Sequence, residues 1–125
     1  MEKEFISYEQ ALSLKELGFD EKCLAWYNPK KFIFAAELGF IKNSENWLLL
    51  NQCAAPLRQQ AFDWFREKHN LDSWIYCPDE SKGYFAIILK HKRFVSYHEN
   101  FDTYEETELA CLNKLIEIVK NGNKS

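Results

Sequence analysis

Ser7-Tyr8-Glu9-Gln10-Ala11, near the N-terminus, and Thr103-Tyr104-Glu105-Glu106-Thr107, near the C-terminus, decide how this chain is organised. In each segment a hydroxyl residue is followed three positions later by Gln or Glu. That is the spacing of a capping box, in which each of the two side chains accepts a hydrogen bond from the other residue's backbone N–H. The segments therefore predict helices that begin at residues 8 and 104, and the sequence between them is largely strand-like.

The sequence predicts three helices, over residues 8–17, 56–70 and 104–120. Gly18 can close the first helix in a left-handed conformation. Pro56 can open the second helix, because its fixed φ and missing N–H suit a first turn. Apolar residues recur at helical spacing along the third helix, and its predicted core face consists of Leu109, Leu112, Ile116 and Val119.

Short apolar runs separated by polar turns predict strands. These runs cover residues 23–27, 32–36, 74–77, 84–89 and 94–98. The run at 84–89 is almost continuously apolar, which predicts a central strand covered on both faces. Residues 40–50 are ambiguous: 43–46 resemble a turn and 47–50 a buried strand, although the pattern leaves a helix open there.

Strands that follow one another through short polar loops favour antiparallel pairing. Helices that cover one face of such a sheet give an α+β protein. A chain of 125 residues has the size of one domain and is long enough to bury a core. We therefore predict a single two-layer α+β domain over residues 1–125, mainly an antiparallel sheet with about three helices.

The composition excludes several classes of protein. Hydrophobic residues make up 46% of the chain and aromatic residues 16%, which excludes a disordered chain. The net charge of −3 argues against general binding to nucleic acid or anionic membranes. No apolar run approaches the ~20 residues of a membrane span, so we expect a protein of the cytoplasm.

The sequence offers no constellation of catalytic or metal-binding residues. Its four cysteines are far apart and lie in apolar surroundings, so buried free thiols are expected rather than a zinc site. Its three histidines are not spaced as metal ligands, and the chain has no nucleophile-elbow, P-loop or dinucleotide-binding motif. We therefore expect no catalytic residues, no metal and no cofactor, although a small enzyme with a dispersed site stays open.

One segment, residues 82–89, partly resembles the RNP1 strand of RNA-recognition domains. Lys82, Gly83 and Tyr84 fit that pattern, but Ala86 and Leu89 stand where stacking aromatics are needed. A small-ligand or single-stranded nucleic-acid binder that uses strands 74–98 is therefore an alternative function. Its candidate binding residues are Tyr84, Lys90, Lys92, Arg93, Tyr97 and His98. This alternative gains support if Tyr84, Tyr97 and the cations of 90–93 share one open face, and it loses support if they point inward or apart.

Three segments of the chain carry a resemblance to known proteins. They are Ile6-Ser7-Tyr8-Glu9-Gln10-Ala11 with residues 15–21, Gln60-Ala61-Phe62 with residues 64–68, and Thr103-Tyr104-Glu105-Glu106 with residues 108–112 and 115–120. Together they resemble a group of short uncharacterised proteins encoded by phages and prophages, notably of Bacteroidetes-type hosts. The resemblance covers about half of the chain. It implies a phage or prophage origin in a bacterial cytoplasm, and it implies no activity and no site residues.

An aromatic core pattern without a catalytic constellation favours a binding role. The leading hypothesis is a non-enzymatic accessory or interaction module that binds a protein partner. Membrane association and general nucleic-acid binding are not expected. A homodimer that buries an edge strand stays open.

Overall fold

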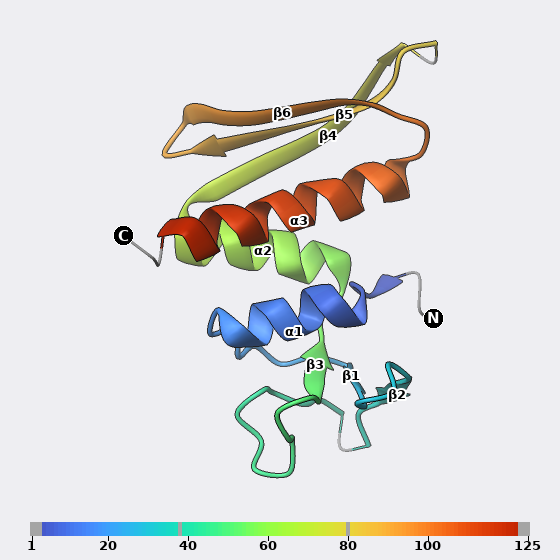
Figure 1. Cartoon of the computed structure of the whole chain (residues 1–125), viewed down its shortest axis with the longest axis vertical. Coiled ribbons are helices and arrows are strands. Elements are labelled where there is room, and N and C mark those ends of the chain that lie inside the picture. Colours follow the sequence, from blue (N-terminus) through green and yellow to red (C-terminus); the bar gives the residue numbers. More distant parts are fainter. Residues whose placement is uncertain (1–3, 38, 80, 123–125) are drawn as a thin grey trace. The chain divides into compact units, whose positions relative to one another are not determined.

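The computed structural model describes residues 4–37, 39–79 and 81–122, and only the backbone at 99 and 100 (Figure 1). The described residues form three helices and two three-stranded antiparallel sheets, which confirms the predicted α+β class. Contacts divide the chain into two compact units, Met1–Ala61 and Phe62–Ser125. The single domain expected over residues 1–125 stays a prediction.

Helix α1 (Tyr8–Glu16) has both ends fixed by local hydrogen bonds. The side chain of Ser7 accepts from the backbone N–H of Gln10, and the Gln10 side chain accepts from the backbone N–H of Ser7, which confirms the predicted capping box. At the other end Gly18 has a φ of 96°, and the N–H of Phe19 donates to the carbonyl of Leu14. This is the Schellman arrangement, in which a left-handed glycine ends a helix.

Unit 1 contains strands β1 (Ala25–Tyr27), β2 (Ile33–Ala35) and β3 (Cys53–Ala55) in the order β2-β1-β3. The predicted turn between β1 and β2 forms because the Asn28 side chain accepts from the backbone N–H groups of Lys30 and Phe32. Helix α1 packs on β3. The core of the unit includes Phe5, Ile6, Ala11, Leu14, Phe19, Cys23, Tyr27, Ile41 and Cys53.

Residues 47–50, where the sequence pattern resembles a buried strand and leaves a helix open, form neither. These residues lie in turns and irregular chain, and only Leu48 is buried. The side chains of Trp47, Leu49 and Leu50 are 51%, 65% and 88% exposed. The strand beside β1 is instead β3, which was not predicted because Cys53-Ala54-Ala55 is short and has no alternation of apolar and polar residues.

Helix α2 (Arg58–His69) crosses the boundary between the units at residue 61. It begins two residues after Pro56 and ends where Asn70 takes a positive φ of 56°, close to the predicted bounds. In unit 2 it is followed by β4 (Leu71–Asp79), β5 (Gly83–Lys90) and β6 (Arg93–Phe101), a sheet of order β4-β5-β6. The strands β4 and β6 extend beyond their predicted bounds, since the hairpins continue pairing through polar residues.

Helix α3 (Tyr104–Gly122) covers one face of this sheet. Thr103 caps it by accepting from the backbone N–H of Glu106. Leu112, Ile116 and Val119 are buried, as predicted, but Leu109 is 48% exposed and does not belong to the core face. Glu108 and Leu115 are buried instead, because the buried face of α3 is shifted by one residue from the face that the sequence predicts.

The strand β5 is central, as predicted, but a second layer does not cover both of its faces. Ile88 and Ala86 are fully buried on the face that holds Ser73, whose hydroxyl bonds the Cys111 thiol of α3. On the opposite face Phe85 is buried between cross-strand aromatics, while Ile87 stays partly exposed.

Candidate functional site

A cavity of about 350 Å³ lies within unit 1. Its walls come from β1, from the segment after β2 and from the irregular loop of residues 42–52. They consist of Trp26, Ala36, Glu37, Phe40, Ile41, Glu45 and Trp47. The volume lies at the lower end of the range of about 300–1,000 Å³ for small-molecule sites, so the cavity suits one side chain or a small ligand. We call it the aromatic pocket.

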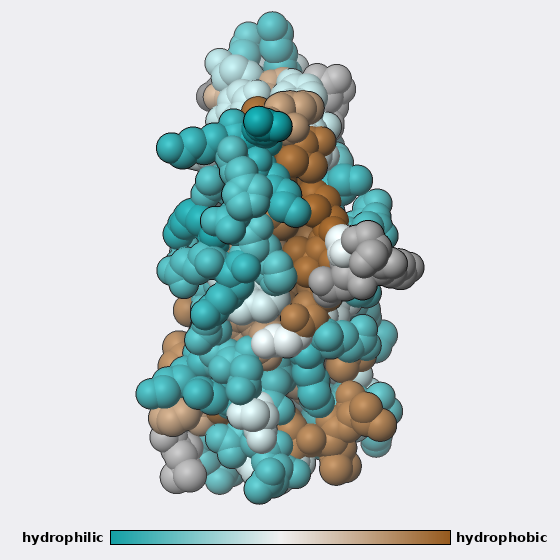
Figure 2. All heavy atoms as spheres, turned by 90° about the vertical axis from the view of Figure 1, so that its left-hand side faces the viewer, coloured by the Kyte–Doolittle hydropathy of each residue, from teal (hydrophilic) through white to brown (hydrophobic). Residues whose placement is uncertain are grey.

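Two tryptophans form a corner of the aromatic pocket. The rings of Trp26 and Trp47 meet edge to face, with centroids 5.0 Å apart and an interplanar angle of 82°. Trp26 is held in turn by the ring of Phe34, its partner across β1 and β2, which stacks on it at 5.1 Å. The Trp26 ring is therefore fixed by the sheet, while Trp47 and Phe40 stay about half exposed at the surface. Figure 2 shows apolar residues reaching the surface at the lower end of the view, where β1–β3 lie in Figure 1.

The start of the loop that carries Trp47 is fixed by two side chains. The amide of Asn43 donates to the carbonyl of Phe19 at 2.8 Å and accepts from the N–H of Ala54 at 2.8 Å. The carboxylate of Asp20 accepts from the N–H of Ser44 at 2.8 Å. These side-chain hydrogen bonds satisfy backbone groups that have no partner strand in an irregular segment.

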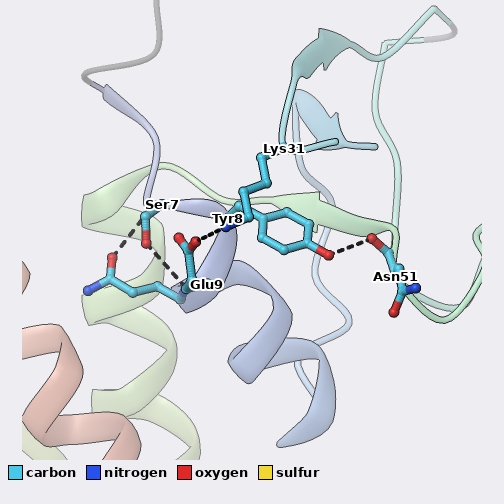
Figure 3. Close-up of polar contacts among 6 residues, drawn as sticks. Ser7, Tyr8, Glu9, Lys31 and Asn51 are labelled. Atoms are coloured by element: carbon cyan, nitrogen blue, oxygen red, sulfur yellow. Dashed lines mark hydrogen bonds and ion pairs between the residues drawn. The ribbon is translucent and has the colours of Figure 1, made fainter. Parts of the chain in front are cut away.

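The end of the same loop is held by α1. The ammonium of Lys15 donates to the carbonyls of Leu49 and Gln52, at 2.8 and 2.7 Å. The hydroxyl of Tyr8 donates to the carbonyl of Asn51 at 2.8 Å, as Figure 3 shows. Trp47 therefore lies between two anchored ends. Figure 3 also shows the ion pair of Glu9 and Lys31, but both side chains are well exposed and the pair contributes little to stability.

The opposite side of the aromatic pocket contains Phe40 and Ile41. Ile41 is 2% exposed and pairs with Cys23 through two backbone hydrogen bonds of 2.8 Å. The ammonium of Lys22 lies 4.5 Å from the centroid of the Phe40 ring, a cation–π contact. A ring at the edge of the pocket thus already binds a cation of the chain itself.

Two carboxylates, those of Glu37 and Glu45, line the aromatic pocket. Within residues 4–37, 39–79 and 81–122, neither of them forms an ion pair with a basic side chain. The pocket therefore combines negative charge with the electron-rich faces of aromatic rings. Both features attract cations.

The residues of the alternative site do not come together on one face of the sheet in unit 2. Tyr84 lies on the helix-covered face with Ile88, and the centroid of its ring is 6.0 Å from that of Tyr104. Tyr97 lies on the other face, where it pairs with Ile87. His98 lies on the Tyr84 side and bonds the hydroxyl of Ser96 at 2.9 Å.

The cations of the alternative site lie at one end of the sheet. Lys90 and Arg93 face each other across the β5–β6 turn, and Lys92 lies within that turn. Tyr84, Tyr97 and the cations therefore do not share one open face, which lowers the support for this alternative.

The face of the sheet that carries Tyr97 is nevertheless aromatic. Tyr76, Phe85 and Tyr97 form a row across the three strands, with neighbouring centroids 5.5 and 5.9 Å apart. Trp74 is 52% exposed on the same face, beside Ile87. In this row Tyr76 and Tyr97, which are 41% and 44% exposed, flank Phe85, which is 6% exposed.

The three buried cysteines are unsuited to nucleophilic chemistry. Burial raises the pKa of Cys23 and Cys53 to about 12 and that of Cys111 to about 11. At neutral pH such thiols stay protonated, and the thiolate is the reactive form. All four cysteines are free thiols, as predicted, but Cys77 is exposed rather than buried, because β4 continues to the rim of the sheet.

The described residues contain no group of three or more His, Cys, Asp or Glu side chains placed to hold a metal ion. Among the described helices, none is both long enough and apolar enough to cross a lipid bilayer. Comparisons with protein-family models, with curated proteins and with solved structures found no match.

Sequence reasoning did not find the aromatic pocket. Its residues come from β1, from residues 36–41 and from residues 45–47, and no spacing in the sequence joins them. The sequence holds no distinct signal for it, because an apolar run that follows an Asn-Ser-Glu-Asn turn is also typical of a strand.

Proposed function

We propose that this protein is a non-enzymatic interaction module that binds a protein partner in the bacterial cytoplasm. A single observation carries the proposal: the aromatic pocket of unit 1, an open cavity with rigid aromatic walls and no nucleophile or metal ligand set among its lining residues. Anchored rings lose little entropy on binding, and Trp is enriched where interfaces concentrate their binding energy. One side chain of the partner would enter the pocket.

The exposed apolar side chains beside the pocket support this proposal. Leu49, on the loop that carries Trp47, is 65% exposed, and Phe34, which stacks on Trp26, is 44% exposed. Exposed apolar side chains together with a pocket are typical of a protein contact rather than of a site for a soluble metabolite. The resemblance to short proteins of phages and prophages agrees with an accessory role, and we propose that origin as well.

A peptide-display library tests the proposed function. Random peptides are selected on the wild-type protein, and each selected peptide is titrated against Trp47→Ala and against Leu50→Ala. Leu50 is the matched control, because it is more exposed than Trp47 and does not line the pocket. We expect at least a tenfold loss of affinity with Trp47→Ala and less than a twofold change with Leu50→Ala.

Binding that is insensitive to Trp47→Ala would contradict the proposed function. The same holds if no peptide is selected. Because Trp47 lies on an anchored loop, Trp47→Phe is included as a variant that keeps a ring in place. It should retain most of the affinity, and urea denaturation should give the same unfolding midpoint for all folded variants.

A further inference from the structure

We propose that the aromatic pocket recognises an alkylammonium group, the side chain of a lysine on the partner. This inference rests on the proposed function and names the chemistry of the same site. Trp26, Trp47 and Phe40 supply aromatic surfaces, and Glu37 and Glu45 supply two negative charges. The combination matches a cation on an aliphatic stem, whose methylene groups also gain contact with Ala36 and Ile41.

The arrangement of the rings favours a compact cation. Trp26 and Trp47 stand at 82° to each other and so form a corner. An ammonium is small enough to lie in such a corner over the face of one ring, whereas a planar guanidinium needs an open ring face along which to stack. The two carboxylates come from separate segments, residues 37 and 45, and each can accept from one of the three donors of an ammonium.

The charges around the pocket agree with this assignment. Within the described residues, neither the half-buried Glu45 nor the exposed Glu37 has a basic partner, so both carboxylates can accept from an added cation. Lys22 already lies over the Phe40 ring at 4.5 Å, but it does not line the cavity. The contact shows that this ring can bind an ammonium while the interior of the pocket stays open to another.

The test uses three small probes that share one stem: n-butylammonium, n-butylguanidinium and neutral 1-butanol. Binding to the full chain is followed by NMR through the indole N–H signals of the tryptophans. Trp26 and Trp47 report on the pocket, while Trp64 and Trp74 are internal controls outside it. We expect saturable shifts of the two pocket signals, with n-butylammonium binding at least fivefold more tightly than either other probe.

Charge variants separate electrostatic recognition from simple burial. Glu37→Gln combined with Glu45→Gln keeps the shape of the side chains and should weaken n-butylammonium at least fivefold without changing 1-butanol. Glu16→Gln is the matched control, since Glu16 is an exposed acid of the same unit outside the pocket. Equal binding of all three probes, tightest binding of n-butylguanidinium, or no shift of the pocket signals would overturn the inference.

The two proposals fail differently. Library peptides that need Trp47 but contain no lysine would overturn the alkylammonium assignment and leave the interaction module standing. Conversely, if n-butylammonium binds but no selected peptide depends on Trp47, the pocket's preference for an alkylammonium is supported and the proposal of a protein partner is overturned.

Discussion

Burial at single residues decides the thiol chemistry of this protein. Three cysteines are buried and their pKa values are raised to about 11 or 12, whereas Cys77 is exposed on β4. At pH 8 we expect one thiol to react quickly with Ellman's reagent in the native protein and four thiols to react after unfolding. A Cys77→Ser variant should lose the fast reaction. Fewer than four thiols in the unfolded protein would reveal a disulfide and contradict the assignment.

Residue-scale features that depend on neighbours in the sequence could be predicted. The caps at Ser7 and Thr103, the left-handed Gly18 and the turn at Asn28 all follow from bonds within five residues. Exposure could not be predicted equally well. Leu109 fits an apolar helical stripe by spacing, yet the sheet contacts the stripe beside it, and only tertiary packing decides between the two.

The β5–β6 hairpin is the element with the clearest room for stabilisation. Its two-residue turn, His91-Lys92, has positive φ at both positions, 50° and 66°, which is the requirement of a type I′ turn. Asn and Gly tolerate these angles better than His and Lys do. The double change His91→Asn and Lys92→Gly should raise the free energy of unfolding by about 1 kcal/mol. Urea denaturation measures it, and a lower stability would show that the turn type is different.

The buried stripe of α3 gives a second test at this scale. Leu112→Ala should lower the free energy of unfolding by about 2–5 kcal/mol, because Leu112 is 1% exposed against the sheet. Leu109→Ala, three residues away and 48% exposed, is the matched control and should change it by less than about 0.5 kcal/mol. Equal losses in the two variants would mean that the helix is rotated.

The irregular loop of residues 42–52 is the element that sequence reasoning missed. Its conformation depends on bonds to partners far along the chain, such as Asn43 to Phe19 and Lys15 to Gln52. A window of sequence contains no sign of such partners, so the apolar residues 47–50 resembled a strand. The aromatic pocket was missed for the same reason, since its walls meet only in the folded protein.

At the scale of the whole molecule, charge bears on nucleic-acid binding. The chain has a net charge of −3, and its most basic stretch offers only Lys82, Lys90, Lys92 and Arg93. If all four side chains contacted phosphates of a single strand, the slope of the logarithm of the binding constant against the logarithm of the salt concentration would be only about −3. We expect no detectable binding of labelled single-stranded RNA or DNA at about 0.15 M salt. Submicromolar binding that Tyr84→Ala abolishes would contradict this and favour the alternative site on strands 74–98.

The double hydrogen bond of Lys15 links the pocket to a helix that does not line it. Acetylation of its ammonium removes the charge and leaves a single amide N–H, so that Lys15 can no longer donate to the carbonyls of Leu49 and Gln52 together and holds the segment behind Trp47 less tightly. By thermodynamic reciprocity, a ligand that needs Trp47 in place must also favour the attached state of the loop. Hydrogen exchange at the Gln52 amide, which donates to the carbonyl of Leu49, would therefore slow when the pocket fills and quicken when Lys15 is acetylated. A modifying enzyme acting on α1 would in this way set the affinity of the pocket.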